Sequence, residues 1–292
     1  MLRITAYHSP TTLDEAAALL AKEGYTVIAG GTDLLVNPRF MVGVREVVDI
    51  HALNLDYISV DNDWLRIGAG ATMRTVAKHP RVQALANGIL ARGAAVCGSP
   101  NIRNMATLAG NVASALPSAD TPPALLALDA QVVLVGRKGE RIVPLVDFFL
   151  GPAKSVREGE LIREIRIPTS QPALHLSGGF YKIGRTREDI SVVNAASSLV
   201  IENNTIVAAR LVLGAVAPTP LHIFQAEELL TGQSVSEALF QAVAEIVRNT
   251  VRPISDQRAS ADYRRRMSGV AAVRALRQAA GLAPSGEEWH HA

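Results

Sequence analysis

Two loops rich in small residues carry backbone and hydroxyl groups that could bind an anionic ligand. The first, residues 28–34, reads IAGGTDL and follows a short β-branched run. Paired glycines at this point let the backbone approach a ligand closely, and consecutive amides in such a turn can form an anion-binding nest. Thr32 adds a hydroxyl donor. The alternative is an ordinary glycine turn between two core elements.

The second loop, residues 107–120, reads TLAGNVASALPSAD and suits a backbone packed flat against a ligand. Asp120 could accept hydrogen bonds from sugar or ribityl hydroxyls, as acidic residues do in dinucleotide sites. Its alternative role is to cap the helix that ALLALDA predicts. Neither loop is a standard phosphate motif, because Gly68-Ala69-Gly70 has Met73 where the dinucleotide fingerprint needs its third glycine.

Alternating strand-like and helix-like segments are predicted to position both loops. Threonines followed by acids at 11–15 predict a helix start, and Gly24 its stop. The β-branched run 25–29 predicts a buried strand ahead of the first loop. Further predicted strands cover 47–50 and 65–67, predicted helices cover 72–78 and 82–92, and a predicted hairpin covers 131–143 with its turn at 137–140.

Beyond a polar, proline-bounded stretch at 168–172, the pattern changes to a strand meander followed by helices. The predicted strands are 178–183, 191–200 and 205–213, and the predicted helices are 221–230, 235–251 and 263–280. This order is typical of a small α+β domain. The basic run Arg264-Arg265-Arg266 is interpreted as a solvated helix face, with a subunit contact as the alternative.

Composition limits the classes of function. Among 292 residues the formal net charge is only +2, which gives no electrostatic reason to expect nucleic acid as a partner. Cys97 is the only cysteine, so this chain cannot ligate an iron–sulfur cluster alone. There is no apolar run long enough for a membrane span and no secretory signal, so we expect a cytoplasmic protein.

Taken together, the motifs resemble a known family. AGGTDLL, IRNMATLAGN with LPSAD after it, and PALLALDAQVVL are similar to the FAD-binding medium subunit of the molybdenum hydroxylases, the xanthine dehydrogenase and carbon monoxide dehydrogenase group. GFYK, RTREDI and ASADYRR continue the similarity in the same order through the C-terminal part. The resemblance covers nearly the whole chain.

The resemblance implies an α+β protein. Its first part would be a two-subdomain FAD-binding fold of the PCMH / vanillyl-alcohol oxidase type, at 1–172, with subdomains of about 1–55 and 56–172. A C-terminal α+β domain with a three-stranded antiparallel sheet and helices would follow at 173–285, and residues 286–292 would be a tail. Relatives usually carry Gly-Gly-Asn where this chain has Ala109-Gly110-Asn111, so the added methyl group is expected to tighten the loop or shift the cofactor.

The implied cofactor is FAD, with its pyrophosphate on the two loops and Asp120 at the ribityl chain. Lys182 matches a basic residue near the flavin, and its alternative role is a salt bridge to Asp189. The implied FAD-binding residues are Ile28, Ala29, Gly30, Gly31, Thr32, Asp33, Leu34, Cys97, Gly98, Ala106, Thr107, Gly110, Asn111, Ala113, Ser114, Ala119, Asp120, Ile162 and Lys182.

The implied function is electron transfer within a larger complex. FAD would take electrons from a separate [2Fe-2S] small subunit, which is supplied by a molybdopterin large subunit, and pass them to an external acceptor. We predict no catalytic acid, base or nucleophile and no metal ligands in this chain. Two alternatives stay open: a stand-alone flavin-dependent oxidoreductase of the same fold, and a scaffold or cofactor-delivery protein without flavin.

Overall fold

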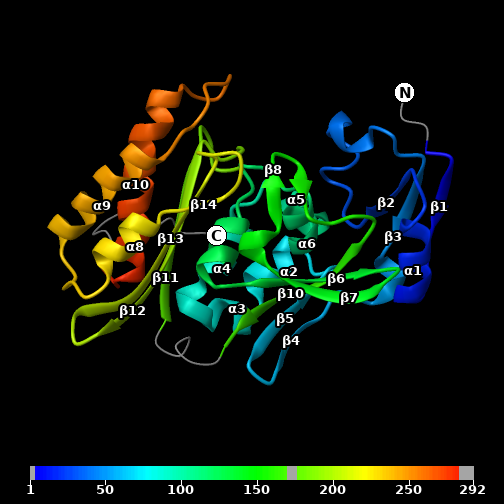
Figure 1. The fold of residues 1–292 in the computed structure, drawn as a ribbon, viewed down its shortest axis with the longest axis horizontal. Helices are drawn as coiled ribbons and strands as arrows, with labels where there is room; N and C mark the ends of the chain where they lie inside the picture. Colours follow the sequence, from blue (N-terminus) through cyan, green and yellow to red (C-terminus); the bar gives the residue numbers. More distant parts are fainter. Residues whose placement is uncertain (1–3, 170–175, 283–292) are drawn as a thin grey trace.

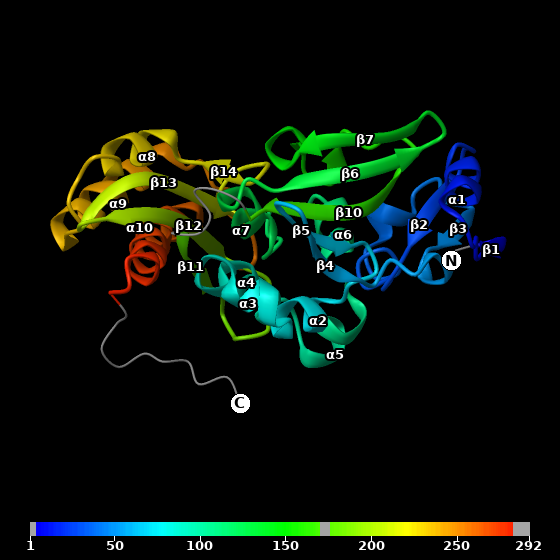
Figure 2. The same cartoon turned by 90° about the horizontal axis from the view of Figure 1, so that it is seen from below.

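The structure is a computed structural model that describes residues 4–169 and 176–282. The described chain is elongated, with an amino-terminal sheet at one end, a larger sheet in the middle and a third sheet, covered by helices, at the other end (Figure 1). Turning the molecule by 90° shows the same order and places the middle sheet between the two ends (Figure 2).

The amino-terminal sheet is parallel, in the order β1-β3-β2, and carries the first loop. Its strands are β1 (Ala6–His8), β2 (Tyr25–Ile28) and β3 (Glu46–Asp49). Helix α1 (Leu13–Leu20) begins as predicted, since Thr12 accepts from the amide of Glu15. The predicted strand at 25–29 is half-buried rather than buried, because β2 is an edge strand.

The middle sheet is antiparallel, in the order β4-β5-β10-β6-β7. Its strands are β4 (Ile58–Asp61), β5 (Trp64–Gly68), β6 (Gln131–Gly136), β7 (Gly139–Pro144) and β10 (Leu161–Pro168). The predicted hairpin is confirmed as β6 and β7. The central strand β10 was not predicted. A small separate hairpin, β8 (Phe149–Gly151) with β9 (Lys154–Ser155), precedes it.

Short helices connect these strands and carry the second loop. They are α2 (Met73–Lys78), α3 (Pro80–Ala84), α4 (Ile89–Ala95), α5 (Pro100–Met105), α6 (Leu108–Ala113) and α7 (Pro122–Ala127). The predicted continuous helix at 82–92 is wrong. The backbone enters the left-handed region at Ala86, Asn87 and Gly88, with φ of 46°, 53° and 70°, which no α-helix tolerates.

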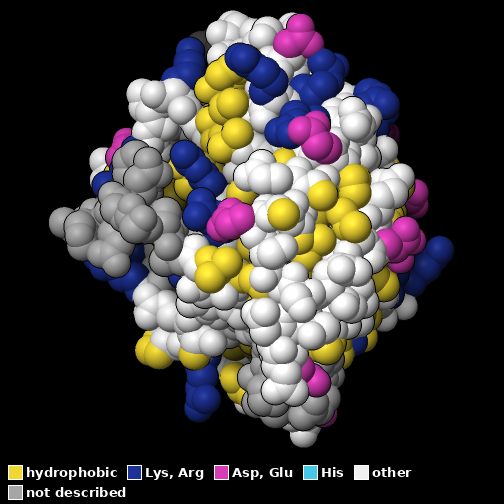
Figure 3. Space-filling view, turned by 90° about the vertical axis from the view of Figure 1, so that its left-hand side faces the viewer, with side chains coloured by type: hydrophobic (Ala, Val, Ile, Leu, Met, Phe, Trp, Pro, Cys, Tyr) yellow, Lys and Arg dark blue, Asp and Glu magenta, His cyan; other side chains and the backbone are white. Residues whose placement is uncertain are grey.

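The C-terminal sheet has the three predicted strands and a short fourth one, in the order β11-β12-β13-β14. They are β11 (Leu176–Ile183), β12 (Val193–Glu202), β13 (Thr205–Gly214) and β14 (Leu221–His222). The predicted helix at 221–230 is therefore wrong in its first turn. The helices are α8 (Phe224–Leu230), α9 (Glu237–Thr250) and α10 (Ala261–Ala279). Their outer side mixes hydrophobic with basic and acidic side chains (Figure 3).

The described residues form two hydrophobic cores, and the C-terminal sheet contributes side chains to each of them. Strand alternation sends Ala195 and Leu199 of β12 into the core beneath α9 and α10, while Ala196 faces the core of the amino-terminal part. Helix α7, whose six residues are all buried, packs on β12 and β13. The two parts therefore share a packed interface.

One prediction for the C-terminal helices is wrong. Arg264 does not lie on a solvated face but is 4% exposed. Its guanidinium donates to Val192 O at 2.6 Å and to Asp256 at 2.8 Å, because the helix turns this position toward β12. Arg266 is exposed, as predicted. No helix within 4–169 and 176–282 is long and apolar enough to cross a membrane.

The predicted division at 1–172, 173–285 and 286–292 stays a prediction. Strand β10 ends at Pro168 and β11 begins at Leu176, on either side of the predicted boundary. Residues 170–175 and the predicted tail lie outside the described residues. The sheets at 6–49 and 58–168 likewise fall on either side of the predicted subdomain limit at about 55.

Candidate flavin site

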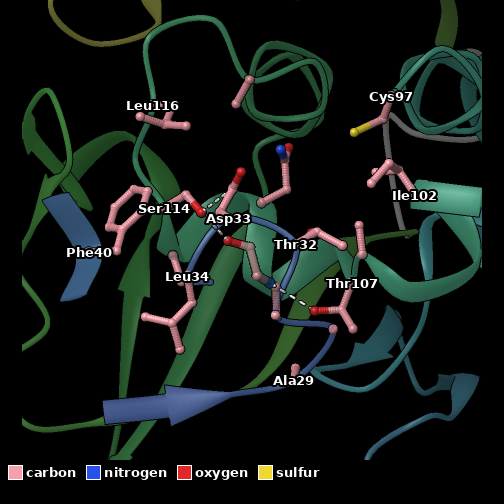
Figure 4. Close-up of a pocket in the computed structure, with 18 of the residues that line it drawn as sticks. Ala29, Thr32, Asp33, Leu34, Phe40, Cys97, Ile102, Thr107, Ser114 and Leu116 are labelled. Carbon is pink, nitrogen blue, oxygen red and sulfur yellow. Dashed lines mark hydrogen bonds between the residues drawn. The ribbon is translucent and has the colours of Figure 1, made fainter. Parts of the chain in front are cut away.

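The two loops predicted to bind a cofactor line one cavity of about 380 Å³. This volume lies within the range of small-molecule sites. Figure 4 shows Thr32, Asp33 and Thr107 in its middle, with Phe40 and Leu116 toward one end and Cys97 and Ile102 toward the other. Of the predicted cofactor residues, all except Lys182 line the cavity.

The first loop passes very close to the backbone at the end of α5, just before the second loop begins. A Cβ atom on Gly30 would lie 1.9 Å from Met105 O, so only glycine lets the first loop pass the end of α5. In addition, the hydroxyl of Ser114 on the second loop donates to Asp33 Oδ2 at 2.6 Å. Tertiary contacts thus hold together two segments separated by about eighty residues.

The first loop presents open hydrogen-bond donors to the cavity. No acceptor among the described residues takes the amide hydrogens of residues 30–34. Buried or half-buried amides without partners are costly, so such a run of donors fits an anionic ligand. In the second loop, Asn111 accepts from Thr121 at 2.6 Å through Oδ1, which leaves its Nδ2 donor for a ligand. The pyrophosphate of FAD is a group of this kind.

Asp120 does not cap a helix, so that alternative is wrong. Helix α7 starts one residue later, with Thr121 at the cap position. The Asp120 carboxylate instead accepts from Lys182 Nζ at 2.9 Å and from Ser191 Oγ at 2.6 Å. Lys182 also donates to Val96 O at 2.9 Å. The alternative partner for Lys182 was Asp189, which is paired with Arg185.

This buried network fixes the Asp120 side chain, which lines the cavity. Burial raises the pKa of Asp120, and the ammonium of Lys182 and the Ser191 hydroxyl oppose that rise. Asp120 lines the cavity and Lys182 does not, so any effect of Lys182 on a ligand would pass through Asp120. The assignment of Lys182 as a flavin contact stays a prediction.

Cys97 is not a reactive thiol. Burial, together with the nearby Asp120 carboxylate, raises the pKa of Cys97 to about 12. The thiol is therefore protonated at neutral pH and serves as an apolar wall of the cavity. Within the described residues, no group of three or more His, Cys, Asp or Glu side chains could hold a metal ion.

Several cavity residues escaped sequence reasoning. Three of them lie within the second loop and the others in strands and connections outside both loops: Thr26, Val27, Phe40, Ile50, Ala69, Ile102, Ala109, Leu116, Ser118, Arg157, Glu188, Asp189 and Ile190. Most are apolar side chains whose sequence signal is only that of a core residue. Seven of them belong to segments that carried the family resemblance, and this was the available signal: Ile102 and Ala109 in IRNMATLAGN, Leu116 and Ser118 in LPSAD, and residues 188–190 in RTREDI.

Comparison with known families agrees with this geometry. Residues 2–170 match the family described as the FAD binding domain in molybdopterin dehydrogenase. Residues 179–279 match the carbon monoxide dehydrogenase flavoprotein C-terminal domain. The first match alone covers more than half of the chain.

Individual proteins extend the similarity over nearly the whole length. The chain is 32% identical over 274 residues to the xanthine dehydrogenase FAD-binding subunit of Escherichia coli O157:H7, covering 90% of this chain and 92% of that one. It is 32% identical over 278 residues to the carbon monoxide dehydrogenase medium chain of Hydrogenophaga pseudoflava, covering 94% and 96%.

Solved structures show the same fold. A carbon monoxide dehydrogenase from Hydrogenophaga pseudoflava superimposes with a TM-score of 0.90 at 30% identity, covering 97% of this chain and 100% of that chain. Quinoline 2-oxidoreductase from Pseudomonas putida 86 gives 0.89 at 28% identity, covering 97% and 99%.

The fold and cavity define an FAD-binding flavoprotein of the oxidoreductase class. The chain belongs to the family of FAD-binding subunits of the molybdenum hydroxylases, which includes those of xanthine and carbon monoxide dehydrogenases. The predicted fold class and cofactor are thereby confirmed.

Proposed function

We propose that this chain holds FAD in the cavity between its two loops and works as the electron-transfer subunit of a molybdenum hydroxylase complex. The open amides of residues 30–34, in a cavity also lined by Gly110 and Asn111, are the observation that carries the proposal. They would hold the pyrophosphate, while the carboxylate of Asp120, oriented by Lys182 and Ser191, would face the ribityl chain.

When bound, FAD joins one-electron to two-electron chemistry. The protein's contribution is to bind and orient it and to exclude water from its buried side. Cys97 is protonated, and the Asp120 carboxylate is already engaged by its neighbours, so neither is a free acid or base for a substrate. The relatives named as an FAD-binding subunit and a medium chain favour electron transfer within a complex over a stand-alone oxidoreductase.

The proposed partners are a [2Fe-2S] small subunit that supplies electrons and a molybdopterin large subunit that oxidises the substrate. Medium chains at about 30% identity support this assembly, because the carbon monoxide dehydrogenase relatives are named as one chain of a larger enzyme. We further propose a cytoplasmic location.

A substitution at Gly30, where the first loop passes close to Met105, tests the cofactor site. Gly30→Ala places a methyl group against Met105 O, so it should shift the first loop and weaken FAD binding at least about tenfold. Titration of the FAD-free full chain, followed by flavin fluorescence, measures the affinity. Gly43→Ala is the control: its φ of 76° makes alanine strained by about 1 kcal/mol, but the added atom meets nothing within 4 Å.

An affinity for FAD equal to that of the wild type in Gly30→Ala would contradict the proposed site.

Isolation of the protein from its own cells tests the complex. The expected result is co-purification with an iron–sulfur chain and a molybdopterin chain, together with a flavin spectrum. Turnover of an organic substrate by the isolated chain would instead favour the stand-alone oxidoreductase.

A further inference from the structure

One stretch of the chain carries an unbalanced positive charge. Residues 64–119 contain no Asp or Glu, although the whole chain has 27 acids among 292 residues. The chain outside this stretch has more acids than bases, so the small net charge of +2 conceals a local excess of positive charge. The basic residues of the stretch are Arg66, Arg74, Lys78, Arg81, Arg92 and Arg103.

Short helices bring part of this stretch together. Helix α2 packs against α3, α4 and α5, and Figure 2 shows the four helices grouped on the side of the molecule away from β7. Arg74 Nη1 donates to Asn104 Oδ1 at 3.0 Å, which joins α2 to α5. Arg74 and Lys78 are four residues apart on α2 and so share a face of the helix. Arg81 follows in the first turn of α3.

The basic residues of these helices are exposed and without acidic partners. Arg74, Lys78 and Arg81 are exposed, and none of them pairs with an acid among the described residues. Arg66, in the same stretch, is different, because it pairs with Asp61 at 2.7 Å and with Glu164 at 2.9 Å. Unpaired surface charges of one sign produce a positive potential, which attracts an acidic partner.

Two exposed apolar side chains accompany these charges. Ile102 and Met105, three residues apart on α5, are 39% and 54% exposed. Apolar side chains with a charged rim are typical of a protein–protein interface. The α2–α5 face is defined here as Arg74, Lys78, Arg81, Ile102 and Met105.

The α2–α5 face adjoins one end of the flavin cavity. Ile102 belongs to both, since it lines the cavity on the same side as Cys97 (Figure 4). Asp120 is held at this end too, because Lys182 donates at 2.9 Å both to Asp120 and to the carbonyl oxygen of Val96, which precedes Cys97. With Asp120 as the proposed ribityl contact, the isoalloxazine ring that the ribityl chain carries would lie at this end.

We propose that the α2–α5 face is the docking surface for an acidic face of the [2Fe-2S] subunit. Electrons reach a flavin from a donor that comes close to the isoalloxazine, and this face adjoins the cavity end where the ring would lie. A [2Fe-2S] cluster held by four thiolates also carries negative charge, which a basic surface attracts. This inference rests on the proposed placement of FAD and on the proposed partners.

Charge reversal on α2 tests the docking surface. The FAD-loaded full chain is titrated with the iron–sulfur chain that co-purifies with the wild type, at low and at high salt. In the double variant Arg74→Glu with Lys78→Glu, the affinity at low salt should fall at least about tenfold, because two attractions become repulsions. The affinity of the wild type should fall as salt screens the attraction, and that of the variant should fall less.

Arg137→Glu with Lys138→Glu is the matched control. These residues are exposed in the turn between β6 and β7, and neither pairs with an acid among the described residues. Figure 2 shows β7 on the opposite side of the molecule from α2 and α5. The control should keep the wild-type affinity. An equal loss in both double variants would overturn the proposal, because net charge and not the α2–α5 face would then cause the loss.

The rate of flavin reduction separates a docking defect from a cofactor defect. At subsaturating concentrations of the reduced iron–sulfur chain, this rate should fall in parallel with the affinity in Arg74→Glu with Lys78→Glu. The flavin content and the flavin midpoint potential should stay as in the wild type, because neither residue lines the cavity. A slower rate at wild-type affinity would contradict a docking role.

Three further outcomes would also overturn the proposal. The first is wild-type affinity for the iron–sulfur chain in the double variant or, should that variant not fold, in Lys78→Glu. The second is loss of the molybdopterin chain with the iron–sulfur chain retained. The third is capture of anionic lipid vesicles by the wild type but not by the variant, at unchanged affinity for the iron–sulfur chain. If no iron–sulfur chain co-purifies with the wild type, the proposed function itself fails, and this inference with it.

Discussion

At the scale of single residues, Asp120 is the side chain whose role differs most between sequence and structure. Sequence reasoning left a helix cap and a ribityl contact as alternatives for it. The structure gives its carboxylate three side-chain donors from the C-terminal part: Lys182, Ser191 and, at 3.4 Å, Asn194. The residue therefore joins the cavity to the second domain.

Replacement of Asp120 should destabilise the folded chain. Asp120→Asn leaves the ammonium of Lys182 buried beside a neutral amide, and breaking a buried ion pair in this way costs about 3 kcal/mol. The urea midpoint of the FAD-free chain measures the loss. The double variant Asp120→Asn with Lys182→Met should recover much of it, since no unpaired charge remains. An additive double variant would argue against the pair.

At the scale of elements, Arg264 shows how a basic run on a helix can be divided between core and solvent. Helix α10 is capped by Ser260, whose side chain accepts from the amide of Tyr263. This start sets the rotation of the helix, so Arg264 points inward while Arg266 is exposed. Asp256, in the connection before the helix, then pairs with Arg264 at 2.8 Å.

This pairing predicts a loss of stability in acid. Burial raises the pKa of Asp256, but the amides of Arg258 and Ala259 and the guanidinium of Arg264 outweigh it and hold the pKa at about 2, below the ordinary 3.8. Because the folded pKa is the lower one, Asp256 stabilises the fold above pH 3.8 and this contribution disappears as the pH falls toward 2.

Urea unfolding between pH 5 and pH 2, done on the wild type and on Asp256→Asn, measures this contribution. The variant should be the less stable protein at pH 5, and the difference should shrink toward about pH 2. Asp262→Asn is the matched control, because Asp262 pairs with Arg265 on the exposed side of the same helix. A difference that does not change with pH would contradict the assignment.

At the scale of the whole molecule, the C-terminal domain holds a residue of the proposed flavin site in place through side chains that lie outside the cavity. Lys182 on β11 and Asn194 on β12 hold Asp120, and the same sheet covers α7, all of whose residues are buried. A flavin domain without this sheet would expose α7 to water and leave Asp120 without its donors.

A chain ending at residue 172 should therefore fail to retain FAD. Removal of β11 and β12 exposes the apolar face of α7 and frees the Asp120 carboxylate, so we expect poor solubility or an FAD affinity lowered by at least about tenfold. A chain ending at residue 282 is the control and should bind FAD as the full chain does. Equal FAD affinity in the chain ending at 172 would make the C-terminal domain dispensable for the cofactor.

The sequence by itself determined the local features of this protein. Thr12 and its acids start α1, the repeat of β-branched residues gives β6 and β7, and the glycine pair at 30 and 31 marks the first loop. Each of these depends on interactions between neighbours in the chain, which the order of residues records directly.

Only the tertiary structure decided which distant groups meet. The strand β10 lies at the centre of its sheet, and Lys182 pairs with Asp120 and not with Asp189. Arg157 lines the cavity although nothing in its local sequence marks it. These contacts join residues separated by tens of positions, and burial, which sets their energies, exists only once the chain has folded.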